Sequence, residues 1–203
     1  LQRNGELEIT QEQKWSEIPG RLSRLPAELQ LTLGKGKAYA VAIETGASEA
    51  DLDFGGLPIS QMTIRQGAGR IAVGFSAPNP VAMSSLSFSG GASDVAMENL
   101  ANANFSEMKV EGGAAAYLLA FGGNLQRDAS VRVTAAASSV EIRLPALMAV
   151  QVTAETFLGG VDVGDGFTKK EGAFQTQAAL AGQSPRLTIH ANVTMGSLRL
   201  RLV

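Results

Sequence analysis

A segment of twelve residues recurs five times in the middle of the chain, and this repeat limits the possible folds more than any other feature. The five copies are MTIRQGAGRIAV, LSFSGGASDVAM, MKVEGGAAAYLL, VRVTAAASSVEI and VTAETFLGGVDV, which begin at residues 62, 86, 108, 131 and 152. Successive starts are 24, 22, 23 and 21 residues apart (86−62, 108−86, 131−108, 152−131), and the copies align without gaps. A period of this length is typical of solenoids and propellers.

The apolar positions of each copy change parity along the segment. In the first copy Met62, Ile64 and Ala68 share one parity, whereas Ile71 and Val73 have the other. Because a β-strand alternates its faces with period two, the chain is predicted to bend between the seventh and tenth positions. Small or turn-forming residues stand there in every copy. We therefore interpret the glycine-rich QGAG stretch as a corner; a phosphate-binding loop would occur once, between a strand and a helix.

These observations predict an all-β fold, a single-stranded parallel β-helix (β-solenoid) with coils of about 22 residues that stack on one another. Like side chains then stack on like. Ala68, Ala92, Ala114 and Ala137 are expected to pile up inside the coil. On this hypothesis Ala114→Leu overpacks the core and costs about 1–3 kcal/mol.

The chain is predicted to form one domain in four segments. These are an N-terminal strand and capping segment (1–28), the solenoid coils (29–163), a side loop or hairpin (164–186) and a C-terminal coil (187–203). The first coil is expected to have its corner at residues 34–37, GKGK. Trp15, the sole tryptophan, is interpreted as a packing plug of the cap, with a ligand-stacking platform as the alternative.

At the far end the leucines at 198, 200 and 202 alternate with Arg199 and Arg201. Outward arginines on a terminal strand would discourage the addition of another chain to the edge of the sheet.

The segment 164–186 is longer than the other connections, and loops on rigid scaffolds often carry function. The candidate interaction surface consists of Phe167, Lys169, Lys170 and Phe174. The plainer alternative is an extension whose two phenylalanines pack on the last coils.

Composition excludes several classes of function. The formal net charge of −2, from 17 basic and 19 acidic residues, provides no field to attract nucleic acid. With no cysteine, the chain has no disulfide, thiolate nucleophile or cysteine-based zinc site. No apolar run approaches the roughly 20 residues that a membrane helix needs. The chain begins at Leu1, so we expect membrane contact only through segments absent from it.

The residues that could carry chemistry are few. His190, the sole histidine, is expected to point outward from a strand. The stretch from Asp162 to Gly166, DVGDG, lacks the further ligands of a calcium loop and is interpreted as an acidic turn. Lys109, Glu111 and Arg132 are expected to be neighbours on successive coils, which indicates ordinary surface ion pairs. No catalytic, cofactor-binding or metal-binding residue, and no cofactor, is predicted.

Several phrases carry a family resemblance: LQLTLGKGKAYAVAI, MTIRQGAGRIAV, VRVTAAASSVEIRLP, LGGVDVGDGF and LTIHANVTMGSLRLRL. They resemble the toast-rack group of bacterial β-solenoid domains, which includes LiaF-like and adhesin-type chains. The resemblance implies a right-handed β-helix, an envelope location often beside transmembrane helices, and a role in protein interaction or stress sensing.

We therefore expect a non-catalytic scaffold of the bacterial cell envelope that acts as an interaction, adhesion or stress-sensing module with an unidentified protein or envelope partner. The alternative is a β-helix that binds or cleaves polysaccharides. A third hypothesis, a homo-oligomer or a rod that assembles end to end, stays open.

Overall fold

The computed structural model describes residues 2–3, 6–7, 33–34 and 36–203, and the chain divides into two units, residues 1–32 and 33–203. In the first unit two short strands, β1 (Gln2–Arg3) and β2 (Glu6–Leu7), pair antiparallel. Trp15 and most of the predicted capping segment lie outside the described residues, as does the start of the predicted first coil.

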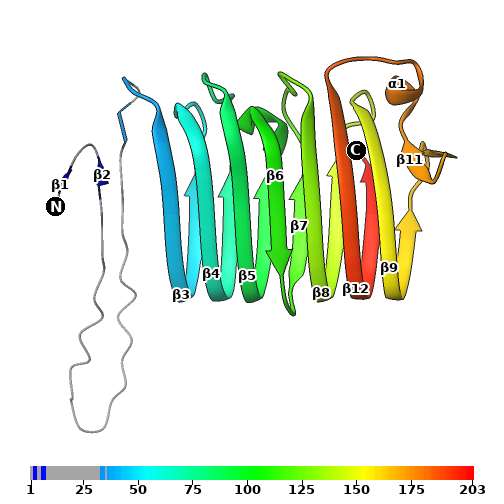
Figure 1. Ribbon diagram of the computed structural model, residues 1–203, viewed down its shortest axis with the longest axis horizontal. Helices are drawn as coiled ribbons and strands as arrows, with labels where there is room; N and C mark the ends of the chain where they lie inside the picture. Colours follow the sequence, from blue (N-terminus) through cyan, green and yellow to red (C-terminus); the bar gives the residue numbers. More distant parts are fainter. Residues whose placement is uncertain (1, 4–5, 8–32, 35) are drawn as a thin grey trace, which may run out of the picture. The chain divides into compact units, whose positions relative to one another are not determined.

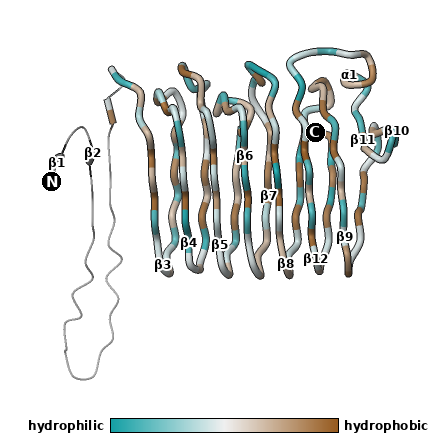
Figure 2. Tube along the Cα trace, viewed as in Figure 1, coloured by the Kyte–Doolittle hydropathy of each residue, from teal (hydrophilic) through white to brown (hydrophobic). Residues whose placement is uncertain are grey.

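The second unit consists mainly of long, bent strands in one parallel stack. The bounds are β3 (Tyr39–Asp53), β4 (Ile59–Gly74), β5 (Met83–Glu98), β6 (Phe105–Gly112), β7 (Ala116–Ala120), β8 (Ala129–Leu144), β9 (Ala149–Val163) and β12 (Arg186–Leu202). Each long strand runs along one face, turns through a tip and returns on the other face, and β6 and β7 together form one such coil (Figure 1). Apolar and polar residues alternate along the strands (Figure 2), as expected for a sheet with one buried face.

The ladder confirms the alignment of the first four repeat copies. Met62 pairs with Leu86, Leu86 with Met108, and Met108 with Val131, all in parallel strands. The described residues are thus nearly all-β, as predicted, with the architecture of a solenoid; a 3-10 turn η1 (Leu100–Ala103) and a short helix α1 (Gln177–Leu180) are the exceptions. The predicted handedness and coil length stay predictions.

The last strand of the chain is not the last strand of the stack. Ile189 pairs with Val131 on one side and with Val152 on the other, so β12 lies between β8 and β9. Coils that follow one another in the sequence therefore do not all stack directly on one another, and the predicted stacking needs this correction. The inward side chains of β12, such as Ile189 and Leu200, are fully buried because both flanks are covered. Arg199 and Arg201 accordingly lie on an interior strand, and their predicted role in protecting a terminal edge is wrong.

The prediction that the alanines of the tips lie inside the coil is also wrong. Their predicted alignment on successive coils is confirmed for the first pair. Ala68 lies opposite Ala92, yet Ala68 is only half-buried, and Ala92, Ala114 and Ala137 are exposed. The parity change falls between the fifth and eighth positions. The eighth position faces inward, and Ser93 there is 4% exposed. The alanines therefore lie on the outside of the tips.

Close approach of the backbones explains why the tips are rich in glycine. Gly46, Gly67, Gly91 and Gly113 hold the same position on successive coils. A Cβ at Gly67 would lie 2.9 Å from the carbonyl oxygen of Gly46, and one at Gly113 would lie 3.0 Å from that of Gly91. Gly69 has a φ of +112°, a conformation that side chains with a Cβ rarely adopt. The QGAG stretch is a corner of the coil, as predicted.

The first long strand begins later than predicted. Val41 pairs with Met62, and the tip of β3 lies at Gly46, Ala47 and Ser48. Gly34, Gly36 and Lys37 precede the strand, so the corner predicted at residues 34–37 is wrong.

Asparagines tie the loops at the other end of the coils together. Asn79 is fully buried, and its amide donates to the carbonyl oxygens of Ile59 (2.7 Å) and Ala103 (3.0 Å) on the two adjoining coils. Asn104 donates in turn to the carbonyl oxygen of Val81 at 2.9 Å. Buried amides with full hydrogen bonding fix the loops against the core and leave the strand faces as rigid surfaces.

Candidate interaction surfaces

The segment between β9 and β12 folds as a hairpin followed by α1. Strand β10 (Thr168–Lys170) pairs antiparallel with β11 (Ala173–Gln175), which places Lys169 opposite Phe174. The Nζ of Lys169 lies 5.4 Å from the centre of the Phe174 ring, a cation–π distance. Phe167 and Phe174 are half-buried against the core, whereas Lys169 and Lys170 are exposed. The two phenylalanines thus pack as in the plainer alternative, and the role of this surface in binding stays a prediction.

The hairpin closes one part of the edge of β9. Gln175 pairs with Gln151, and Phe174 pairs with Val152. The hydroxyl of Thr176 accepts from the backbone N–H of Val150 at 3.0 Å and donates to the carbonyl oxygen of Met148 at 2.8 Å. These bonds provide hydrogen-bond partners for the backbone at the start of β9.

The remainder of β9, from Thr153 to Val163, has β12 on one side and no strand on the other among the described residues. The tip of this coil is apolar: Phe157 is 81% exposed and Leu158 is 60% exposed. Met195, the partner of Leu158 on β12, is 47% exposed. We call Phe157, Leu158 and Met195 the apolar tip. Leu158 holds the seventh position of the fifth repeat copy, where the other four copies have alanine, so a large residue in this column was a usable signal for an exposed apolar tip.

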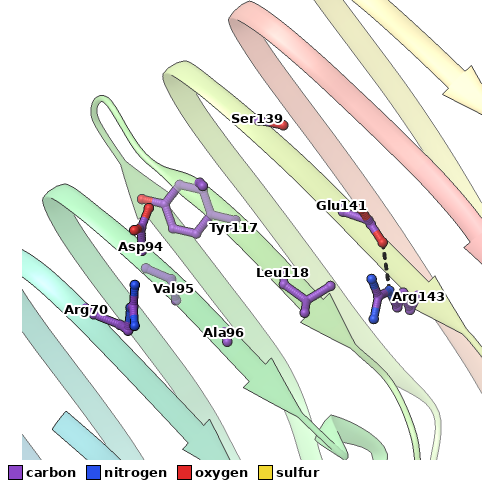
Figure 3. Close-up of a pocket in the computed structure, with 10 residues that line it drawn as sticks. Arg70, Asp94, Val95, Ala96, Tyr117, Leu118, Ser139, Glu141 and Arg143 are labelled. Carbon is purple, nitrogen blue, oxygen red and sulfur yellow. Dashed lines mark hydrogen bonds and ion pairs between the residues drawn. The ribbon is translucent and has the colours of Figure 1, made fainter. Parts of the chain in front are cut away.

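A shallow trough crosses the face formed by the second halves of the coils (Figure 3). Its volume is about 290 Å³. Ala96 and Leu118 line its middle, with Arg70 and Asp94 on one side and the Glu141–Arg143 pair on the other. Arg143 Nε donates to Glu141 Oε1 at 2.7 Å.

The trough lies beside an interruption of the ladder. The coil formed by β6 and β7 leaves strand geometry at residues 113–115, and a second hollow of about 570 Å³ over these tips shares Arg70, Asp94 and Ala116 with the trough. The ring of Tyr117 packs edge-on against Phe88, and burial raises the pKa of its hydroxyl, which has no hydrogen-bond partner. The trough offers charges of both signs around an apolar floor that includes Ala96 and Leu118, a surface suited to polar contacts.

The residues considered for chemistry lie on the opposite face. Lys109 and Glu111 form an ion pair of 2.9 Å, and both side chains are about half exposed, so the pair stabilises the fold by less than about 1 kcal/mol. Arg132 lies opposite Lys109, as predicted. The structure adds exposed His190 on the other side of Arg132. This neighbour could not be predicted, because it follows from the insertion of β12.

The acidic stretch at the end of β9 is divided between two surroundings. Asp162 pairs with Arg201, and the hydrogen bond from that guanidinium holds the pKa of Asp162 below its ordinary value. Asp165 lies in the following turn, exposed. Across residues 36–203 and the shorter described ranges, no group of three His, Asp or Glu is placed to hold a metal ion.

The arrangement defines a class of protein: a rigid β-solenoid with polar strand faces and an apolar tip at one end. No helix within the described ranges has the length and apolar character to cross a membrane.

Residues 2–81 match the family model described as the N-terminal domain of toast_rack, DUF2154. The chain is thus similar to toast-rack domains over these residues, and the resemblance drawn from the repeated segments is confirmed.

The fold is also similar to the crystal structure of a protein named as a putative cell adhesion protein from Clostridium sporogenes ATCC 15579. The TM-score is 0.56 at 11% sequence identity, over 84% of this chain and 96% of that one. At this identity the likeness shows the fold. No curated protein sequence matches the chain.

Proposed function

We propose that the chain is a non-catalytic interaction module of the bacterial cell envelope, in which a right-handed β-solenoid scaffold serves adhesion or sensing. The observation that carries the proposal is the charged trough: Arg70, Asp94, Glu141 and Arg143 surround an apolar floor on strands that are paired with one another. Rigid elements position binding groups more accurately than loops do.

The charges of the trough are arranged for polar contacts. Glu141 accepts a hydrogen bond from Arg143 Nε at 2.7 Å. The pair presents a carboxylate and a guanidinium side by side, and both groups can form contacts with a polar partner.

The comparisons support the location and the type of function. Residues 2–81 match the model of a toast-rack domain, and the structural neighbour bears the name of a putative cell adhesion protein. We therefore propose a partner on the envelope of a bacterium, either a protein or a surface polymer.

The experiment measures the attachment of the purified chain to intact bacterial cells and to purified envelope fractions. We expect the wild-type chain to bind and the double variant Arg70→Glu/Arg143→Glu to bind at least tenfold more weakly. The control is Lys109→Glu, on the opposite face, which should bind as the wild type does. Equal binding by the trough variant would refute the site, and absence of binding by the wild type would refute the function. Turnover of a polysaccharide in a parallel screen would replace the proposal with a carbohydrate-active enzyme.

A further inference from the structure

We propose that two copies of the chain associate through the open edge of β9, antiparallel and around a two-fold axis at the apolar tip. The inference uses a different surface from the charged trough and does not depend on the proposed function.

The edge of β9 is prepared for strand addition. Between Thr153 and Asp162 the strand pairs with β12 on one side, and its other side faces no strand among residues 36–203. An uncovered strand edge presents a row of backbone donors and acceptors, which another strand can satisfy. The hairpin covers the edge as far as Val152, which pairs with Phe174 of β11. The available edge is therefore short and has a defined end.

The centre of this edge is the most exposed apolar pair of the stack. Phe157 and Leu158 are adjacent at the tip of β9, 81% and 60% exposed. Large exposed apolar side chains, aromatic ones above all, mark the cores of protein interfaces. Burial of this pair would contribute favourable free energy in addition to the backbone hydrogen bonds.

The charges oppose the simplest mode of self-association, in which the last coil of one copy stacks on the first coil of another. Continued in the register of the stack, β9 would set Glu155 against Glu44 and Asp162 against Asp51, because these pairs hold the same repeat positions. Like charges directly opposite one another destabilise a sheet. Growth into a head-to-tail rod is therefore disfavoured.

The antiparallel mode avoids this conflict. Strand β9 bends at its tip, and the two-fold axis passes through this bend. The residues before the bend in one copy therefore pair with the residues after the bend in the other copy. With Phe157 opposite Leu158 of the second copy, Glu155 lies opposite Gly160 of that copy, and Thr153 lies opposite Asp162. No carboxylate then faces another carboxylate. Ala154 of one copy lies opposite Val161 of the other, and both side chains point into the coil. Each is half-buried in a single copy, so the hydrophobic core would continue across the interface.

The pairing is closed by symmetry, so it ends at a dimer. It comprises only the segment Thr153–Asp162 of each copy. Interfaces of this size are typically weak and transient, and we expect a dimer that dissociates on dilution.

The first test is the mass of the full chain in solution between about 1 and 200 µM, because self-association depends on concentration. We expect the weight-average mass to rise from 21.1 kDa towards twice that value. Phe157→Asp should keep the chain monomeric throughout. Leu147→Asp is the matched control, since Leu147 is 90% exposed and lies in the connection between β8 and β9, away from the tips; it should dimerise as the wild type does.

The second test fixes the register. The chain has no cysteine, and a Cβ at Gly160 meets no atom within 4 Å, so cysteine can be introduced there without strain. Mild oxidation of Glu155→Cys/Gly160→Cys should give a disulfide-linked dimer, because opposite residues in antiparallel strands lie within disulfide distance. Each single variant should stay unlinked.

A wild-type chain that is monomeric at every concentration would overturn the proposal. So would dimers of Phe157→Asp, linked single-cysteine variants, or assemblies larger than a dimer.

Discussion

The glycine column offers the sharpest test of how the coils stack, because the same substitution is expected to have opposite effects at two of its positions. Gly91→Ala adds a methyl group on an interior coil, where a Cβ would lie 2.5 Å from the carbonyl oxygen of Gly67. Gly46→Ala adds the same group on β3, where no described atom lies within 4 Å. Neither glycine has a positive φ, so backbone strain does not distinguish them.

The magnitude follows from the space. Ordinary van der Waals contact begins near 3.4 Å, so the coils at Gly91 must separate by about 0.9 Å. The flanking pairs Gln66–Gly90 and Ala68–Ala92 hold them in the ladder. Overpacking of this kind costs about 1–3 kcal/mol, from which the reduced entropy of the unfolded chain recovers about 0.4–1 kcal/mol. Gly91→Ala should therefore lose about 1–2 kcal/mol, whereas Gly46→Ala should gain about 0.4–1 kcal/mol.

Thermal unfolding followed by circular dichroism measures both variants. For a chain of this length 1 kcal/mol shifts the Tm by roughly 2–4 °C. We expect the Tm to fall by about 2–8 °C for Gly91→Ala and to rise by about 1–4 °C for Gly46→Ala. Shifts of the same sign and size would refute the reasoning, because they would mean that the backbone of a neighbouring coil does not limit the space at Gly91.

Three further measurements test the interior and one surface turn. Ala135 is 2% exposed, so Ala135→Leu should lower the free energy of unfolding in urea by about 1–3 kcal/mol, whereas Ala114→Leu on an exposed tip should stay within about 0.5 kcal/mol; equal losses would contradict the corrected position of the bend. Tyr117→Phe removes a buried hydroxyl without a partner, and stability should stay constant or rise by about 1 kcal/mol, while a loss of that size would reveal a bond to a buried water. The hydroxyl of Ser76 is the main group that holds the pKa of Asp53 below its ordinary value of 3.8. The resulting stabilisation is present above pH 3.8 and is lost as the pH falls through the lower, folded-state pKa, so Asp53→Asn should flatten the decline of stability in that range; an unchanged profile would exclude this carboxylate.

The alternation of side chains was visible in the sequence because a strand is a local structure with period two. Met62, Leu86 and Met108 could be placed opposite one another before any coordinates, since a one-residue slip would turn every apolar side chain to the solvent. The corner at QGAG followed from the same parity. The exact position of the bend did not, because Ala92 and Ser93 are both small and only their packing shows which one faces inward.

The order of the coils was decided by the tertiary structure alone. All copies present similar inward columns, so a repeat pattern leaves several neighbours equally compatible, and Val131 could pair as well with Val152 as with Ile189. The strand with fully apolar inward positions, β12, buries them on both flanks only between β8 and β9. That choice leaves the coil with Phe157 and Leu158 at the end of the stack. The sequence determined that the chain forms coils and which side chains of each strand point inward. The tertiary structure decided that β12 is covered on both sides and that the edge of β9 stays open.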